Sequence, residues 1–159
     1  MEEEFDTGNA STRRGRMLGP DARCRSCGFA DGAALQRDAE GIICYECASA
    51  AAGHSTMEAH HPLGRANDPD ITIGAPGNLH RLLDAQKAAW PEAVRKNMSR
   101  DPLLMVVAVA LAVRDFARVM MGYAQGIADW LMQLHRTLCD RDGEAWWLAS
   151  NLPPLWGVA

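Results

Sequence analysis

Two pairs of residues, about twenty positions apart, have the side chains to hold a divalent metal ion. The first is the tandem pair His60 and His61, and the second is His80 with Asp84. On a helix that begins near Asn78, His80 and Asp84 lie on the same face because they are four residues apart. In an extended segment His60 and His61 point to opposite sides, so one imidazole can bind a metal while the other stays free as a base. Such a site suits phosphodiester hydrolysis.

A cationic residue follows the histidine pair and could contact a phosphate. Arg65 ends the turn Pro62-Leu63-Gly64-Arg65, and a guanidinium there can form paired hydrogen bonds to phosphate oxygens. The formal net charge of the chain is −4, so the protein is not broadly basic. Any contact with phosphates must therefore be local or bridged by a metal ion.

A separate metal site is predicted upstream of the histidines. Cys24 and Cys27 are separated by two residues, as are Cys44 and Cys47, and sixteen residues lie between the pairs. This spacing is typical of zinc sites, in which four thiolates complete a closed tetrahedral shell. Gly41 and the apolar residues after it predict a short hairpin between the pairs, as in a zinc ribbon. A closed shell has no open coordination position. We therefore expect a structural zinc ion that stabilises this region in place of a larger hydrophobic core.

The chain becomes apolar and helical from Asp101. Asp101 is the predicted N-cap, and Pro102 is the predicted first helical residue. Apolar residues then recur at steps of mostly three and four up to Leu138, which predicts one long helix or two helices that meet near Gly122. We expect this region to supply most of the apolar core, mainly through Leu104, Leu111, Phe116, Ile127 and Trp130.

Composition places the chain among ordinary globular proteins. It has 159 residues, of which 48% are hydrophobic and 23% charged, enough for one domain or two small ones. The start Met1-Glu2-Glu3-Glu4 lacks the features of a secretory signal. The longest apolar run, 103–113, is too short to span a bilayer. Paired cysteines with metal-site spacing fit a reducing compartment. We therefore expect a cytoplasmic protein with no membrane segment.

The residues around the histidines resemble the HNH endonucleases, also called ββα-metal or His-Me finger nucleases. Members of that family carry Glu-x-His-His, then Gly-Arg, a short strand, a His-x3-[His/Asp] pair, and a following Gln and Trp. The resemblance covers residues 58–91. The matching residues here are Glu58-Ala59-His60-His61, Gly64-Arg65, Thr72-Ile73, His80 with Asp84, Gln86 and Trp90-Pro91.

The resemblance implies a role for each histidine. His61 would be the general base that takes a proton from water, which then attacks the phosphorus. His60, His80 and Asp84 would hold one divalent metal, Mg²⁺ or another ion, that stabilises the leaving oxygen.

The sequence departs from the family pattern in two places. Many members have a Cys-x2-Cys half-site before the last histidine, whereas this chain has no thiol in residues 75–79. The upstream four-cysteine site could stabilise the fold in place of that half-site. The family's middle asparagine falls where this chain has Ile71. Asn67 and Asn78 are both candidates to support the loop of His61, although neither lies at the position of the family's asparagine.

These observations together predict an α+β protein with four parts. Residues 1–20 form a disordered tail, 21–53 a four-cysteine zinc ribbon, 54–100 an HNH-like ββα-metal motif, and 101–159 a C-terminal helical region. The expected activity is divalent-metal-dependent hydrolysis of DNA.

Two other interpretations remain open at this point. One is a non-catalytic zinc module that binds nucleic acid or protein on an HNH-like scaffold. The other is a helical interaction protein, which forms a homodimer or binds a protein partner through its C-terminal helices. An exposed face containing Met105, Met120, Met121 and Trp130 would favour the helical interaction protein.

Overall fold

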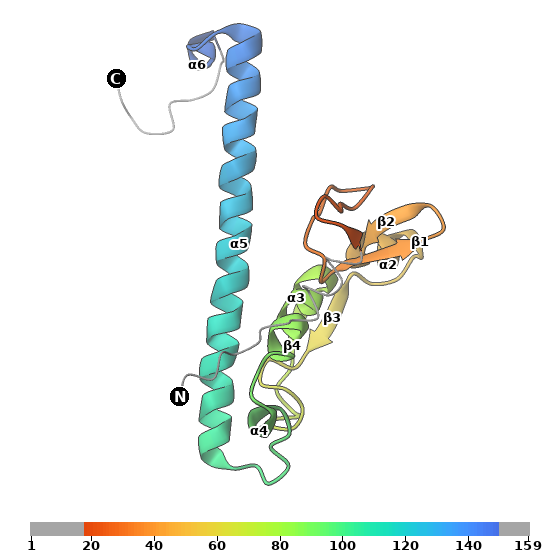
Figure 1. Cartoon of the computed structure of the whole chain (residues 1–159), viewed down its shortest axis with the longest axis vertical. Helices are drawn as coiled ribbons and strands as arrows, with labels where there is room; N and C mark the ends of the chain where they lie inside the picture. The colour runs from red at the N-terminus through yellow and green to blue at the C-terminus, as the bar shows by residue number, and fades with distance from the viewer. Residues whose placement is uncertain (1–17, 150–159) are drawn as a thin grey trace. The chain divides into compact units, whose positions relative to one another are not determined.

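A computed structural model describes residues 18–149, and the predicted tail therefore lies almost wholly outside the described residues. The chain divides into two compact units, Met1–Val119 and Met120–Ala159. It combines helices with small antiparallel strand pairs, so the α+β prediction is confirmed at this level (Figure 1). The elements are β1 (Leu35–Asp38), β2 (Gly41–Cys44), α2 (Tyr45–Ala51), β3 (Met57–His60), β4 (Ile73–Pro76), α3 (Gly77–Lys87), α4 (Glu92–Arg95), α5 (Pro102–Asp142) and α6 (Trp146–Ala149).

The predicted hairpin between the cysteine pairs is formed by β1 and β2. The strands are antiparallel, with Leu35 opposite Cys44 and Asp38 opposite Gly41. The turn needs a glycine because Gly41 has a φ of +130°, a conformation that other residues rarely adopt. A small core forms beneath this hairpin from residues that share near-complete burial. These residues are Ala22, Cys24, Leu35, Ile43 and Cys44.

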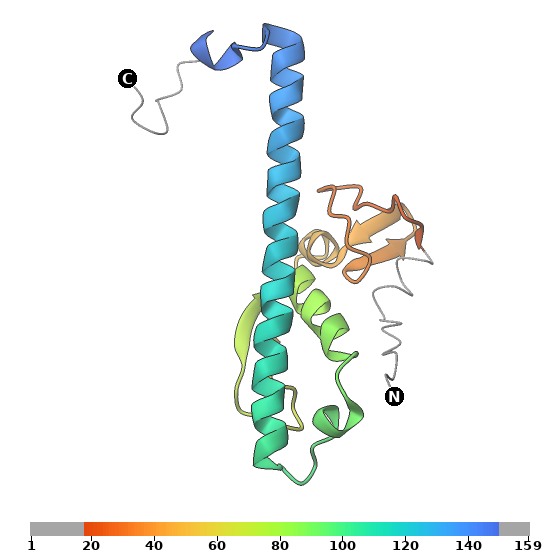
Figure 2. The same ribbon diagram turned by 60° about the vertical axis from the view of Figure 1, so that its left-hand side comes forward.

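A second hairpin, β3 and β4, leads directly into helix α3. Met57 lies opposite Pro76, and His60 lies opposite Ile73. At the start of α3, the Gly77 N–H donates to the carbonyl of Thr56 at 2.7 Å. A Cβ at Gly77 would lie 2.7 Å from a ring carbon of Tyr45, the first residue of α2, so glycine is needed at this contact. Helices α2 and α3 lie side by side (Figure 2).

The first half of α5 is anchored on the segment that follows α3. Helix α5 begins as predicted, because the Asp101 carboxylate accepts hydrogen bonds from the N–H groups of Leu103 and Leu104 at 2.8 and 3.3 Å. Ala108 is fully buried against Trp90 and Val94. The Trp90 indole N–H also donates to Asp115 Oδ2 at 2.6 Å, and both partners are buried.

We expect Asp115→Ala to destabilise the protein by about 1–3 kcal/mol, because it leaves the buried Trp90 indole N–H without an acceptor. Chemical denaturation followed by tryptophan fluorescence would measure the loss. Asp129→Ala is the matched control, since this exposed aspartate lies on the same helix, and its effect should stay within about 0.5 kcal/mol. Equal losses in the two variants would contradict the anchoring role of Asp115.

Helix α5 is one continuous helix of 41 residues, so the alternative of two helices that meet near Gly122 is wrong. In the second unit, the indole N–H of Trp146 in α6 donates to His135 Nδ1 in α5 at 3.1 Å. None of the described helices combines the length and apolarity needed to cross a bilayer.

The prediction that this region supplies most of the apolar core is wrong. Phe116, Ile127 and Trp130 are 46%, 59% and 60% exposed, while Leu104 and Leu111 are only partly buried. The spacing of apolar residues predicted the helix correctly, but it does not specify what covers each face. The fully buried residues of α5 are only three among those described, namely Ala108, Asp115 and Val119.

Candidate metal centres

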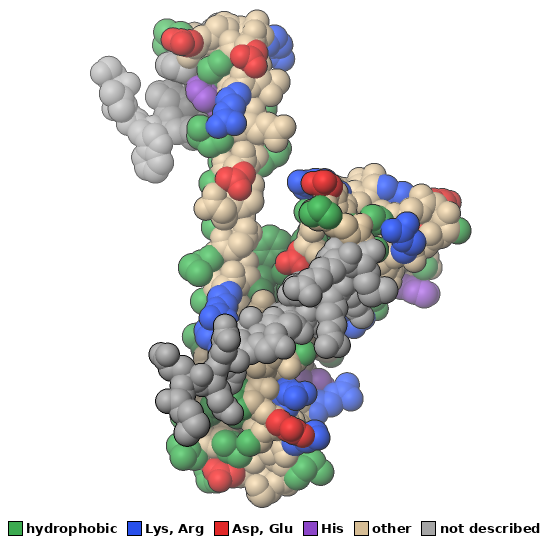
Figure 3. All heavy atoms as spheres, viewed as in Figure 1, with side chains coloured by type: hydrophobic (Ala, Val, Ile, Leu, Met, Phe, Trp, Pro, Cys, Tyr) green, Lys and Arg blue, Asp and Glu red, His purple; other side chains and the backbone are tan. Residues whose placement is uncertain are grey.

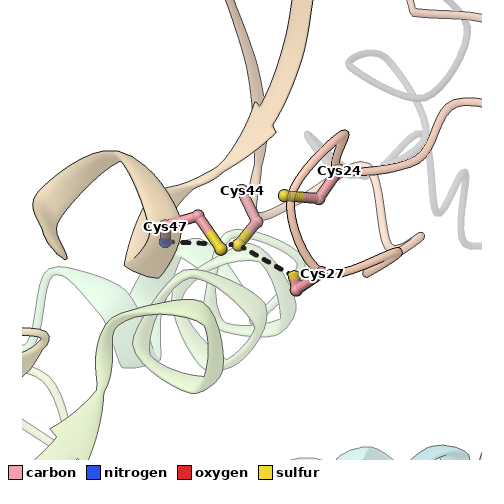
Figure 4. Close-up of side chains that lie close together, drawn as sticks. All are labelled: Cys24, Cys27, Cys44 and Cys47. Atoms are coloured by element: carbon pink, nitrogen blue, oxygen red, sulfur yellow. Dashed lines mark hydrogen bonds between the residues drawn. The ribbon is translucent and has the colours of Figure 1, made fainter. Parts of the chain in front are cut away.

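The four paired cysteines converge at one place. Their sulfur atoms all lie within 4.8 Å of one another, and all four are free thiols (Figure 4). Cys44 ends β2, and Cys47 lies in the first turn of α2, where its N–H donates to Cys44 Sγ at 3.4 Å. The Cys27 and Cys44 sulfurs are 3.6 Å apart, inside the range of about 3.5–4 Å that a tetrahedral zinc–thiolate shell requires. The cluster can hold a metal ion such as zinc.

The sulfur atoms differ in how readily they ionise. Burial acts to raise the pKa of Cys24, but hydrogen bonds from the backbone of Cys44, Cys27 and Ser26 outweigh it and lower the pKa to about 6. Burial raises the pKa of Cys47, and the neighbouring thiols raise it further. The thiolate of Cys24 therefore forms easily, whereas Cys47 resists ionisation. A bound cation would remove that resistance, because it stabilises all four thiolates together.

A second cluster contains the three residues predicted to bind the divalent metal. His60 ends β3, while His80 and Asp84 lie one turn apart on α3, and the ligand atoms of all three are within 4.8 Å of one another. Asp84 Oδ1 is 3.6 Å from His60 Nδ1, and Asp84 Oδ2 is 3.3 Å from His80 Nε2. The Asp84 side chain is 44% exposed, so this cluster is open to solvent.

The protonation state of His60 suits metal binding. Its side chain is almost completely buried, and Nδ1 has no hydrogen-bond partner among the described residues. Burial lowers the pKa of His60 to about 4, helped by the nearby charge of Lys87, so the imidazole is neutral at pH 7. A buried polar atom without a partner is costly, and a cation beside Asp84 would satisfy it. Two imidazoles and a carboxylate form a donor set that divalent metals accept.

Glu58 supports this cluster, although we did not predict a role for it. Its carboxylate is hydrogen-bonded to His80 Nδ1, which leaves His80 Nε2 directed toward Asp84. A carboxylate behind a metal-binding histidine fixes the tautomer and orientation of the ring. Burial acts to raise the pKa of Glu58, but hydrogen bonds from Tyr45 and His80 and the charge of Arg81 lower it. The sequence feature that indicates this role is the position of Glu58, two residues before His60 in the same strand and therefore on the same face.

Lys87 is a second residue that the sequence analysis missed. Its Nζ lies 3.2 Å from Asp84 Oδ1 and donates to the carbonyl oxygen of His61 at 2.6 Å. Burial lowers the pKa of Lys87, while the carboxylate of Asp84 opposes that shift. Lys87 therefore ties the backbone of the histidine pair to helix α3. It lies three residues after Asp84, on the same helical face.

His61 and Arg65 lie outside the cluster of three. The His61 side chain is partly exposed, and its Nδ1 is buried without a hydrogen-bond partner among the described residues. Arg65 is exposed and makes no ion pair within residues 18–149. Both side chains are accessible from the solvent side of the loop that follows β3.

Within residues 18–149, neither candidate asparagine forms a hydrogen bond to His61. The amide of Asn67 donates to the carbonyl oxygens of Leu63 and Val94 at 3.0 and 2.8 Å, which ties this loop to α4. Asn78 pairs with Glu46 instead. Among the described residues, Asn67 therefore supports this loop and Asn78 does not. Asn67 supports the loop through backbone groups, which a motif comparison cannot reveal.

An apolar cavity of about 280 Å³ lies beside His60. Its lining includes Leu83, Trp90 and Phe116, and it reaches Lys87 at one side. His61 is not part of that lining. The apolar walls suit a hydrophobic group and not a phosphate, so the cavity is no substrate site for phosphodiester chemistry.

The two clusters are joined by the residues between Cys44 and Cys47. The N–H of Asn78, in the first turn of α3, donates to Glu46 Oε1 at 2.9 Å, and the Glu46 N–H donates to Asn78 Oδ1 at 3.1 Å. Tyr45 hydrogen-bonds to Glu58, the residue that holds His80. Two adjacent residues of the cysteine segment therefore connect it to the second cluster. Glu46 pairs with Asn78 at the start of α3, and Tyr45 pairs with Glu58, which holds His80.

Comparisons with known proteins returned no matching family model, no similar curated protein and no similar solved structure.

Proposed function

We propose that this protein is a divalent-metal-dependent DNA endonuclease whose β3–β4–α3 segment is a ββα-metal motif. The observation that carries the proposal is the cluster of His60, His80 and Asp84, in which the buried Nδ1 of His60 has no hydrogen-bond partner among the described residues. A second imidazole, His61, follows directly in the sequence. The resemblance of residues 58–91 to HNH endonucleases supports DNA as the substrate.

His60, His80 and Asp84 would hold one divalent ion such as Mg²⁺, and the four cysteines would hold structural zinc. When bound, the divalent ion would neutralise phosphate charge and stabilise the leaving oxygen. His61 would accept a proton from water through Nε2, because its Nδ1 is buried, as the water oxygen attacks the phosphorus. Lys87 holds the His61 backbone while this proton moves.

Substrate contacts in this proposal are few and local. Arg65 is exposed on the loop after His61, and its guanidinium can pair with a phosphate next to the scissile bond. A net charge of −4 argues against a broad, positively charged surface that binds DNA through many phosphates. Binding should therefore depend strongly on the metal ion and on Arg65.

Supercoiled plasmid provides the direct test. The zinc-loaded protein is expected to convert plasmid to nicked or linear forms in Mg²⁺ or Mn²⁺, and EDTA should stop the reaction. No conversion with any divalent metal would overturn the proposal.

Asp84→Ala should raise the Mn²⁺ concentration needed for half-maximal nicking by at least about tenfold, because the variant loses one charged ligand. Titration of nicking rate against Mn²⁺ would measure the shift. Asp70→Ala is the matched control, since Asp70 is an exposed aspartate on the preceding loop. The same metal dependence in Asp84→Ala and the parent would remove Asp84 from the metal site.

A non-catalytic zinc module is the second candidate function. The four-cysteine cluster favours it, because a closed thiolate shell stabilises a small fold without taking part in chemistry. In that case the protein would bind nucleic acid or a protein without hydrolysing it.

A further inference from the structure

An uninterrupted apolar stripe runs along helix α5. Its members are separated alternately by three and four residues, without exception over nine positions. We call these residues the α5 stripe: Val106, Val109, Val113, Phe116, Met120, Tyr123, Ile127, Trp130 and Leu134.

The α5 stripe is largely uncovered. Eight of its nine side chains are exposed, from 37% for Tyr123 to 65% for Val113, and Met120 is partly buried. Hydrophobic side chains protrude along this helix in Figure 3. Scattered exposed apolar residues are ordinary, but a continuous row of this length marks an interaction surface.

The spacing identifies the shape of the partner. Alternate steps of three and four give an average period of 3.5 residues, which is the a/d pattern of a left-handed coiled coil. A surface with that period is matched by another helix with the same period, packed side by side.

The positions that flank the stripe indicate how close the partner can come. They are mostly small and uncharged, so two helix backbones can approach closely and no flanking charge selects a different partner. The charged residues of this part of α5 lie farther round the helix. The small flanking residues are Ala110, Ala112, Ala117, Ala124 and Gly126, and the outer charged residues are Arg114, Arg118, Asp129 and Arg136.

We propose that the α5 stripe pairs with the α5 stripe of a second copy to form a homodimeric coiled coil. A second copy supplies a helix of identical period and length, which makes a self-complementary twofold interface. The exposed stripe residues, with Leu131 beside them, offer on the order of 900 Å² per copy, and a stable dimer buries about 800 Å² per partner.

Analytical ultracentrifugation of the full chain tests this proposal without any assay of hydrolysis. The parent should sediment as a dimer at micromolar concentrations. Ile127→Asp should raise the dimer dissociation constant at least about 100-fold, because it places an unpaired charge within the apolar interface. Ile127→Leu, which keeps an apolar side chain at that position, should remain dimeric.

Met132→Asp is the matched control. Met132 is 53% exposed, close to the 59% of Ile127, but it lies on the side of α5 away from the stripe. It should leave the dimer intact. A monomeric parent at tens of micromolar would overturn the proposal, as would equal dissociation of the Ile127→Asp and Met132→Asp proteins. Circular dichroism of each variant should show unchanged helix content.

Discussion

His61→Ala is expected to reduce plasmid nicking by about 10²–10⁴-fold while leaving metal binding intact, since this is the usual contribution of a general base. His61 is not one of the three clustered ligands, so its removal leaves His60, His80 and Asp84 in place. Initial nicking rates in Mg²⁺ would measure the loss, and calorimetric titration with Mn²⁺ would report on the metal site.

His54→Ala is the appropriate control for the His61 experiment. His54 is an exposed histidine in the segment between α2 and β3, outside the cluster of three ligands. Its replacement should change neither the nicking rate nor metal affinity. Nicking by His61→Ala at the parent's rate would eliminate the proposed general base, whatever the metal titration shows.

Cys24→Ser should abolish zinc binding and unfold the region around β1 and β2. Structural zinc supplies about 10–16 kcal/mol of apparent binding free energy in small zinc domains, and the core beneath this hairpin contains only a few buried residues. Native mass spectrometry should show one zinc in the parent and none in the variant. Hydrogen exchange should show lost protection in residues 22–51, while the helical circular dichroism of α5 remains.

Loss of zinc should also weaken the second metal site. Glu46 and Tyr45 lie between Cys44 and Cys47 and form hydrogen bonds to Asn78 and Glu58, so unfolding of this region would leave α3 and His80 without these supports. Mn²⁺ affinity should fall by about 10–100-fold, the usual effect of losing outer-shell support. Cys139→Ser is the control, because Cys139 lies on α5 in the other unit. Full zinc retention by Cys24→Ser would contradict the four-cysteine site.

Local spacing determined which features could be predicted from sequence. Cys44 and Cys47 are three residues apart at a strand–helix junction. The local backbone therefore brings their sulfur atoms together without help from distant residues. Asp101 caps α5 through N–H groups two and three residues away. His80 and Asp84 are one helical turn apart, and their proximity follows from the helix alone.

Contacts between distant residues could not be read in the same way. The hydrogen bonds of Asn67 to Val94 and of Glu58 to His80 join residues more than twenty positions apart. Nothing in the spacing of either residue specifies its partner. The apolar period of α5 likewise predicted a helix but not that Ile127 and Trp130 would be exposed.

The pairing of Glu46 with Asn78 has a thermodynamic consequence for how the protein is loaded with metal. Glu46 lies between Cys44 and Cys47, and Asn78 lies in the first turn of the helix that carries His80 and Asp84. If zinc tightens the second site by some factor, the second ion must tighten zinc by the same factor, because binding free energies around a closed cycle are reciprocal. The two ions would then be taken up cooperatively, and zinc scarcity would lower occupancy of the second site even where its own metal is abundant.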